Sequence, residues 1–362
     1  MNPFHERCER TMIVTRTTRF GYAFGLLTLL FSLTLSGCSD TPPALKVLVD
    51  YRERVATPQD LPLPALQLPA VIRPPEPRKL RVEVPDVTVS LLDSLRLDTC
   101  AAGASIVQRN SALGRLETGF RRYHGDLEII DQLNDCLTSL DDPSSELGQR
   151  LQQALAAKRE TLPLLKQRAI ASDDALRHAL TPANQSSADL SNESLAESLD
   201  AFQVLLNLLQ YTEESDQVLI SAERLERALE TLEQNEALGL LWRNQHEWLH
   251  GLEQSHSLVI GSGERSGCLS AGTPQRAQVL RTVFSKYFAA EVQAQVALLI
   301  GHAYRVNPLL TELQKHSNQT LLVDYLTELQ DLSIQLTAAI KTHAEHWQQF
   351  FRDCDFQPGS QS

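Results

Sequence analysis

The sequence predicts an all-α protein, and three observations lead to that fold class. From about residue 88 onward, apolar residues recur at intervals of three and four, which is the spacing of one face of an α-helix. Helix-breaking residues fall between long periodic runs. The last run, over residues 319–353, keeps a single apolar face throughout. We therefore expect an extended helical bundle over residues 88–357, with a proline-rich segment before it and a disordered tail at 358–362.

The N-terminal 37 residues have the features of a secretory signal peptide. Arg16 and Arg19 precede an apolar run over residues 20–35, which is too short to span a bilayer without its flanks. The run ends in the sequence LSGC, which resembles the lipobox of bacterial lipoproteins and places Cys38 first in the mature chain. Translation can start at Met1 or at Met12, because residues 12–37 already form a complete signal.

The lipobox resemblance implies a lipid anchor. In that class the cysteine thiol receives a diacylglyceryl group, so the partner expected for acylated Cys38 is a lipid bilayer. Ser39, rather than aspartate, follows the cysteine, which favours the periplasmic face of the outer membrane. Asp40 keeps the inner membrane open as the alternative.

Residues 38–87 form the anchor region, a short helix and a proline-rich segment. Residues 44–56 are amphipathic, and eight prolines then follow within residues 57–90, a density that favours extended chain. Residues 80–84 alternate as an edge strand does, although we favour extended chain lying over the helical body. We expect the segment to pack, because four of its residues are leucines: Leu61, Leu63, Leu66 and Leu68.

The helical region divides at turn signals and at two polar loops. The loops are residues 181–192 and 257–272, and Asn307 before Pro308 is typical of a helix start. We expect helices near residues 89–98, 100–117, 120–140, 144–179, 193–212, 215–234, 236–256, 274–304, 308–317 and 319–353.

Four cysteines remain after the signal peptide and Cys38 are set aside, and an even number in an oxidising compartment predicts two disulfides. Of the three possible pairings, helix geometry favours Cys100–Cys136, which are equidistant from a helix-ending signal at 118–119. It also favours Cys268–Cys354, at adjoining ends of two antiparallel helices. The alternative is a pair of reactive redox cysteines, which would need CxxC spacing or a nearby cationic group. The sequence shows neither feature.

The charge balance argues against two kinds of partner. The whole chain has a formal net charge of −12, and removing residues 1–37 with their four arginines and two glutamates leaves 29 basic and 43 acidic residues. An acidic chain is unsuited to nucleic acid, and also to an anionic membrane surface.

Residues 246–250 read HEWLH, the HExxH pattern of zinc proteases, and His256 stands where a longer motif has its third ligand. These eleven residues resemble the metzincins, which would imply zinc bound by His246, His250 and His256. Glu253 replaces the glycine that turns the chain, however, and no methionine follows Met12 to form the Met-turn. A continuous helix would also carry His256 about 9 Å beyond His250.

We therefore expect no catalytic residue, metal or other cofactor in this chain. The helix pattern places His246, Glu247 and His250 on a solvated flank, where an adventitious surface metal site is one alternative. His343 lies on an apolar face and is expected to be a satisfied core histidine. Arg109 lies among apolar residues, so it is either a ligand contact in a cleft or one half of an interhelical ion pair.

Several stretches together resemble a family of proteobacterial lipoproteins of unknown function. They are LVDYRERVA, LLDSLRLDTC, QRNSALG, CLSAGTP and WQQFFRDCDF. The resemblance implies export and lipidation, and it carries over no catalytic residue. We expect a non-enzymatic scaffold or binding protein of the cell envelope with an envelope protein as partner. The alternatives are a zinc-dependent hydrolase at 246–250 and a helical protein that binds a small ligand in a cleft.

Overall fold

The computed structural model describes residues 41–85, 100–213, 217–268 and 274–356. Residues 41–362 form one compact unit, and residues 1–40 fall in a separate one. The described residues are helical and contain no β-strand, which confirms the all-α prediction. The expected signal peptide, Cys38, the expected helix at 89–98 and the tail at 358–362 lie outside the described residues.

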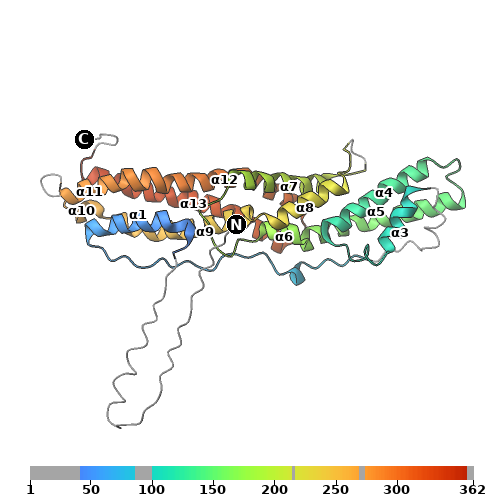
Figure 1. The fold of residues 1–362 in the computed structure, drawn as a ribbon, viewed down its shortest axis with the longest axis horizontal. Coiled ribbons are helices and arrows are strands. Elements are labelled where there is room, and N and C mark those ends of the chain that lie inside the picture. Colours follow the sequence, from blue (N-terminus) through green and yellow to red (C-terminus); the bar gives the residue numbers. More distant parts are fainter. Residues whose placement is uncertain (1–40, 86–99, 214–216, 269–273, 357–362) are drawn as a thin grey trace, which may run out of the picture. The chain divides into compact units, whose positions relative to one another are not determined.

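Long α-helices make up most of this unit (Figure 1). Their bounds are α1 Lys46–Ala56, α3 Ala101–Asn110, α4 Gly119–Thr138, α5 Glu146–Ser172, α6 Asp174–Leu180, α7 Asn192–Gln210, α8 Ala222–Gln234, α9 Ala237–Val259, α10 Ser262–Arg265, α11 Gln275–Val283, α12 Gln293–His316 and α13 Thr320–Asp353. A π-helical stretch, η4 (Phe284–Val292), joins α11 to α12, and short 3-10 turns occupy Pro43–Leu45, Thr57–Gln59 and Pro77–Leu80.

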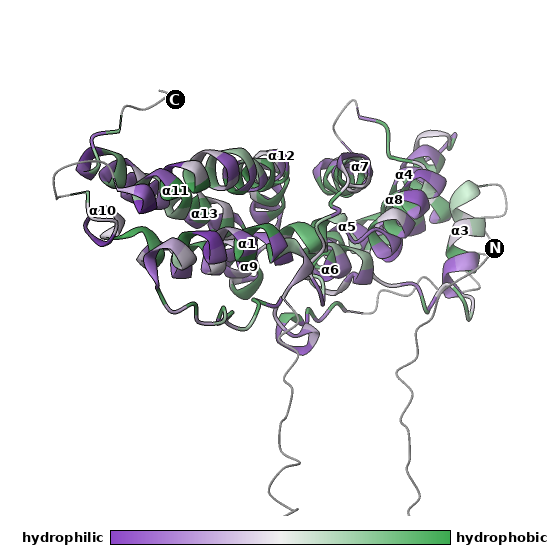
Figure 2. Ribbon diagram, turned by 60° about the vertical axis from the view of Figure 1, so that its left-hand side comes forward, coloured by the Kyte–Doolittle hydropathy of each residue, from purple (hydrophilic) through white to green (hydrophobic). Residues whose placement is uncertain are grey.

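The longest helix, α13, runs beside α9 and α12 (Figure 1). Its predicted apolar face is buried from Leu322 to Phe350. Two polar groups on that face are satisfied by distant segments: the Tyr325 hydroxyl donates to the Leu180 carbonyl at 2.5 Å, and Trp347 Nε1 donates to the Tyr51 hydroxyl at 2.8 Å. Figure 2 shows hydrophobic and hydrophilic residues on the same helices, as amphipathic helices require.

The proline-rich segment lies extended against the helices. Leu61, Leu66 and Leu68 pack on the main core as predicted, whereas Leu63 remains 39% exposed. Hydrogen bonds to backbone carbonyls fix the segment further along, from Arg73 to Pro182 at 2.8 Å and from Arg177 to Pro75 at 2.7 Å. Residues 80–84 form no strand.

Several predicted helix boundaries are wrong. The helix expected over 100–117 ends at Asn110, and the one expected over 144–179 is divided at Asp173, whose side chain caps α6. The helix expected from 215 begins at Ala222. Pro308 lies inside α12 instead of starting a helix, because the apolar stripe continues past it. Packing by that stripe outweighs the roughly 3 kcal/mol that an internal proline costs.

Both predicted disulfides are confirmed. The Cα atoms are 5.8 Å apart in Cys100–Cys136 and 4.7 Å apart in Cys268–Cys354. The cysteines of the second bridge pack in the main core. Those of the first bridge pack against a smaller core between α3, α4 and α5. Among the described residues, no helix is long and apolar enough to cross a membrane.

Candidate anion-binding cavity

A cavity of about 540 Å³ lies among α3, α4 and α5, beside the smaller core. We call it the cationic cavity, because five of its lining side chains are basic and two are acidic. The basic residues are Arg109, Arg115, Arg122, Lys158 and Arg168, and the acidic residues are Glu117 and Asp126.

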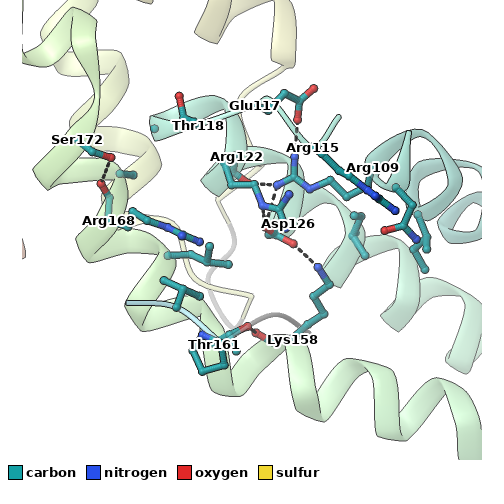
Figure 3. A pocket seen from close by; sticks show the side chains of 18 residues that line it. Arg109, Arg115, Glu117, Thr118, Arg122, Asp126, Lys158, Thr161, Arg168 and Ser172 are labelled. Carbon is teal, nitrogen blue, oxygen red and sulfur yellow. Dashed lines mark hydrogen bonds and ion pairs between the residues drawn. The ribbon is translucent and has the colours of Figure 1, made fainter. Parts of the chain in front are cut away.

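One buried carboxylate lies at the centre of this cluster. Asp126 is fully buried, and three cations from three helices reach it (Figure 3). Arg109 of α3 lies 3.1 Å from its Oδ2, Arg122 of α4 lies 3.0 Å from the same oxygen, and Lys158 of α5 contacts Oδ1. A buried charge needs compensation by the opposite charge, and here one carboxylate faces three cations. The centre of the cavity therefore carries surplus positive charge.

Arg109 fits both interpretations drawn from the sequence. It pairs with Asp126 across helices, and it also lines the cavity. Its guanidinium reaches Glu117 at 2.5 Å and the Gly114 carbonyl at 3.2 Å, yet its Nε is buried with no hydrogen-bond partner in the described part of the chain. Burial lowers the pKa of the Arg109 guanidinium, although an arginine stays charged at neutral pH.

The start of α4, the helix that carries Arg122 and Asp126, is capped by Asp173 between α5 and α6. The Asp173 carboxylate accepts hydrogen bonds from the backbone N–H of Phe120 and of Leu176, both at 3.0 Å, and so caps α4 and α6 together. Gly119 has a φ of +58°, and a Cβ there would lie 2.2 Å from Asp173 Oδ2. Glycine is therefore required at this position.

The cavity also has an apolar wall. It is formed by side chains of α3, α4 and α5 and by the end of the proline-rich segment, namely Ile106, Ile129, Leu165, Ala169, Val84 and Pro85. A ligand in this space contacts both charged and apolar side chains. The volume of the cavity is in the range of sites that bind small organic molecules.

The HExxH segment has a different environment from the one predicted. His246 and Glu247 are buried, with exposures of 3% and 1%, so their predicted position on a solvated flank is wrong. The proline-rich segment covers this face of α9: His246 makes a backbone hydrogen bond with Ala70, and Gln254 exchanges two hydrogen bonds of 2.8 Å with Gln67. Burial lowers the pKa of His246 to about 4.

The three histidines of the longer motif do not share a site. The α9 helix is continuous through all of them, as predicted. The rings of His246 and His250 are 4.7 Å apart, but His256 lies against His343 and His346 of α13 and contacts the Ala339 carbonyl. The described residues hold no group of three side chains placed to bind a metal ion.

His343 lies in a buried polar chain that the sequence did not reveal. Its Nε2 is 2.5 Å from the Tyr51 hydroxyl, which in turn accepts from Trp347. Burial, with smaller contributions from His256 and His346, lowers the pKa of His343 to about 3 and keeps it neutral. This chain ties α1 to α13.

Sequence reasoning found Arg109 but missed the side chains that complete its site. Asp126 and Arg122 stand four residues apart on α4, and Lys158 is on another helix. The i, i+4 spacing was the available signal, but such pairs are usually solvated. Only the packing of α4 against α5 makes this one buried.

The family model described as a protein of unknown function (DUF3080) matches residues 48–358. The chain belongs to the DUF3080 family. No curated protein and no solved structure matches it. The DUF3080 match covers most of α1, the proline-rich segment and every helix of the cationic cavity, so these elements are parts of the family's domain.

Proposed function

We propose that this DUF3080 protein is a binding protein of the cell envelope whose cationic cavity holds a small anion bearing phosphate or carboxylate groups. The observation that carries the proposal is the ratio of three cations to one buried carboxylate at Asp126. Arg115 and Arg168 also line the cavity, and its second acidic residue, Glu117, pairs with Arg109. The lining is thus positive in a chain whose formal net charge is −12.

The donor groups favour oxyanions. Guanidinium groups present planar pairs of N–H donors that match the oxygens of phosphates and carboxylates. The Arg109 guanidinium lines the cavity, although its Nε–H is buried without a hydrogen-bond partner in the described residues. Binding of this kind needs only the charge and the shape of the cavity.

The compartment belongs to the same proposal. The lipobox ending in Cys38 supports a proteobacterial lipoprotein anchored by its acylated cysteine, on the periplasmic face of the outer membrane. The two disulfides agree with an oxidising compartment. The envelope protein partner expected from the sequence remains a prediction.

Calorimetric titration of the protein with inorganic phosphate, pyrophosphate and citrate tests the binding proposal. We expect at least one of them to bind, and the double variant Arg115→Gln/Arg168→Gln to bind it about tenfold or more weakly, because a charge-assisted contact contributes roughly 1.5–3 kcal/mol. Raising the salt concentration should weaken binding as well.

Arg121→Gln is the matched control. Arg121 precedes Arg122 on α4 but pairs with Glu226, and it does not line the cationic cavity. This variant removes the same charge from the same helix and should bind like the unmodified protein. Failure of all three anions to bind, or equal weakening by Arg121→Gln, would contradict the proposal.

A further inference from the structure

The turn between α3 and α4 exposes large apolar side chains beside the cationic cavity. We call residues 111–116 the rim loop. Its two leucines, Leu113 and Leu116, are 79% and 74% exposed, and Val107 in the last turns of α3 is 39% exposed. Single exposed leucines are common on protein surfaces, but two leucines that are each about three-quarters exposed within one six-residue loop are typical of an interaction surface.

The rim loop is held in shape by the cavity itself. Arg109 donates to the Gly114 carbonyl at 3.2 Å, and the Gly114 N–H donates to Ser111 Oγ at 3.1 Å. A Cβ at Gly114 would lie 2.4 Å from the Gln108 carbonyl oxygen, so the chain folds closely over the end of α3. The leucines are therefore displayed by a built structure that shares Arg109 with the anion site.

Charge and apolar surface alternate along this loop. Arg115 stands between Leu113 and Leu116 in sequence and lines the cavity. A partner that satisfies both features carries negative charge next to hydrocarbon. An anionic phospholipid in a bilayer has this arrangement, with its phosphate at the surface and its acyl chains directly beneath.

We infer, building on the proposed anion binding, that the cationic cavity and the rim loop bind the surface of a bilayer containing anionic phospholipid. The headgroup phosphate enters the cavity near Arg115 and Arg122, while Leu113 and Leu116 insert among the acyl chains. The acidity of the whole chain opposes attachment to an anionic surface, but the local charge at this site has the opposite sign. The protein would therefore attach to the bilayer only with the cationic cavity and the rim loop facing it.

Vesicle cosedimentation tests this inference with residues 41–362, which contain every side chain of both cores. The vesicles consist of phosphatidylcholine alone or of phosphatidylcholine with phosphatidylglycerol. We expect binding to the second kind, weakened about tenfold or more in Leu113→Gln/Leu116→Gln, since each leucine loses its transfer into hydrocarbon. The same variant should keep its affinity for the free oxyanion, because neither leucine lines the cavity.

Two further variants separate the contributions. Arg115→Gln should lose affinity for both the vesicles and the free anion. Leu321→Gln/Ile334→Gln removes two exposed apolar residues of α13, 49% and 64% exposed, and should bind vesicles like the unmodified protein.

The outcomes distinguish this inference from the proposed function. Anion binding without vesicle binding overturns the membrane inference alone and leaves a site for a free anion. Equal binding to both kinds of vesicle overturns the headgroup assignment. Absence of binding to any free anion overturns the proposed function, and this inference with it.

Discussion

Two buried carboxylates differ in the number of cations that they meet. Asp126 lies among three, and this surplus makes the cationic cavity a site for a further anion. Glu247 meets one, Arg243, whose Nε is 2.5 Å from its Oε1. Its Oε2 is buried without a hydrogen-bond partner among the described residues. A one-to-one pair of this kind holds a helix face in place and leaves no charge for a ligand.

Glu247→Gln should therefore lower the free energy of unfolding by about 1–3 kcal/mol, because Arg243 loses its charged partner at a buried position. Chemical denaturation measures the change. Glu253→Gln on the same helix is the control, since Glu253 is half exposed, and it should alter the free energy by less than about 0.5 kcal/mol. Equal effects in the two variants would contradict the buried role of Glu247.

At the scale of elements, the two disulfides stabilise different parts of the bundle. Cys100–Cys136 joins the start of α3 to the end of α4, next to the small core and the cationic cavity. Cys268–Cys354 joins the segment before α11 to the end of α13 at the main core. In the chain-entropy model each bridge adds about 4 kcal/mol to the free energy of unfolding. Each bridge stabilises the helices that it joins.

Replacing both cysteines of the first bridge by serine should raise the rate of hydrogen exchange in α3 while leaving α13 protected, because α3 depends on the small core. Exchange measured by mass spectrometry on peptides from each helix checks this. The matched variant, with Cys268 and Cys354 replaced by serine, should leave α3 unchanged. Faster exchange in α3 of that variant would mean that the two cores unfold as one.

At the scale of the whole molecule, charge is distributed unevenly. The chain is acidic overall, yet five basic side chains gather around one cavity with two acidic ones. The net charge is a sum over the whole chain, so it does not describe the charge at one local site. The proposed lipid anchor at Cys38 would attach the protein to a membrane, where the concentration of anionic headgroups is high.

Cys38→Ser should release the protein into the periplasmic fraction or leave an uncleaved precursor, because no thiol remains for acylation. Fractionation of the envelope, with the mass of the N-terminal peptide, measures both outcomes. The control is Ser39→Thr, which keeps the cysteine and should stay in the membrane fraction as a processed form. A processed chain without lipid that stays in the membrane would contradict the lipobox interpretation.

The sequence by itself determined the fold class, the disulfide pairs and the packing of the proline-rich segment. These follow from local periodicity and from the antiparallel pairing of consecutive helices, which brings matched helix ends together and can be inferred from the order of helices and turns. It also singled out Arg109 as a covered cation with two possible roles.

Tertiary structure alone decided the surroundings of individual side chains. Glu247 was expected in water because the helix pattern gave only one buried stripe on α9, whereas the proline-rich segment covers a second face. Asp126 and Lys158 stand 32 positions apart and meet only because α4 packs on α5. Burial and charge depend on which elements become neighbours in space, and the periodicity of a single helix carries no information about its second neighbour.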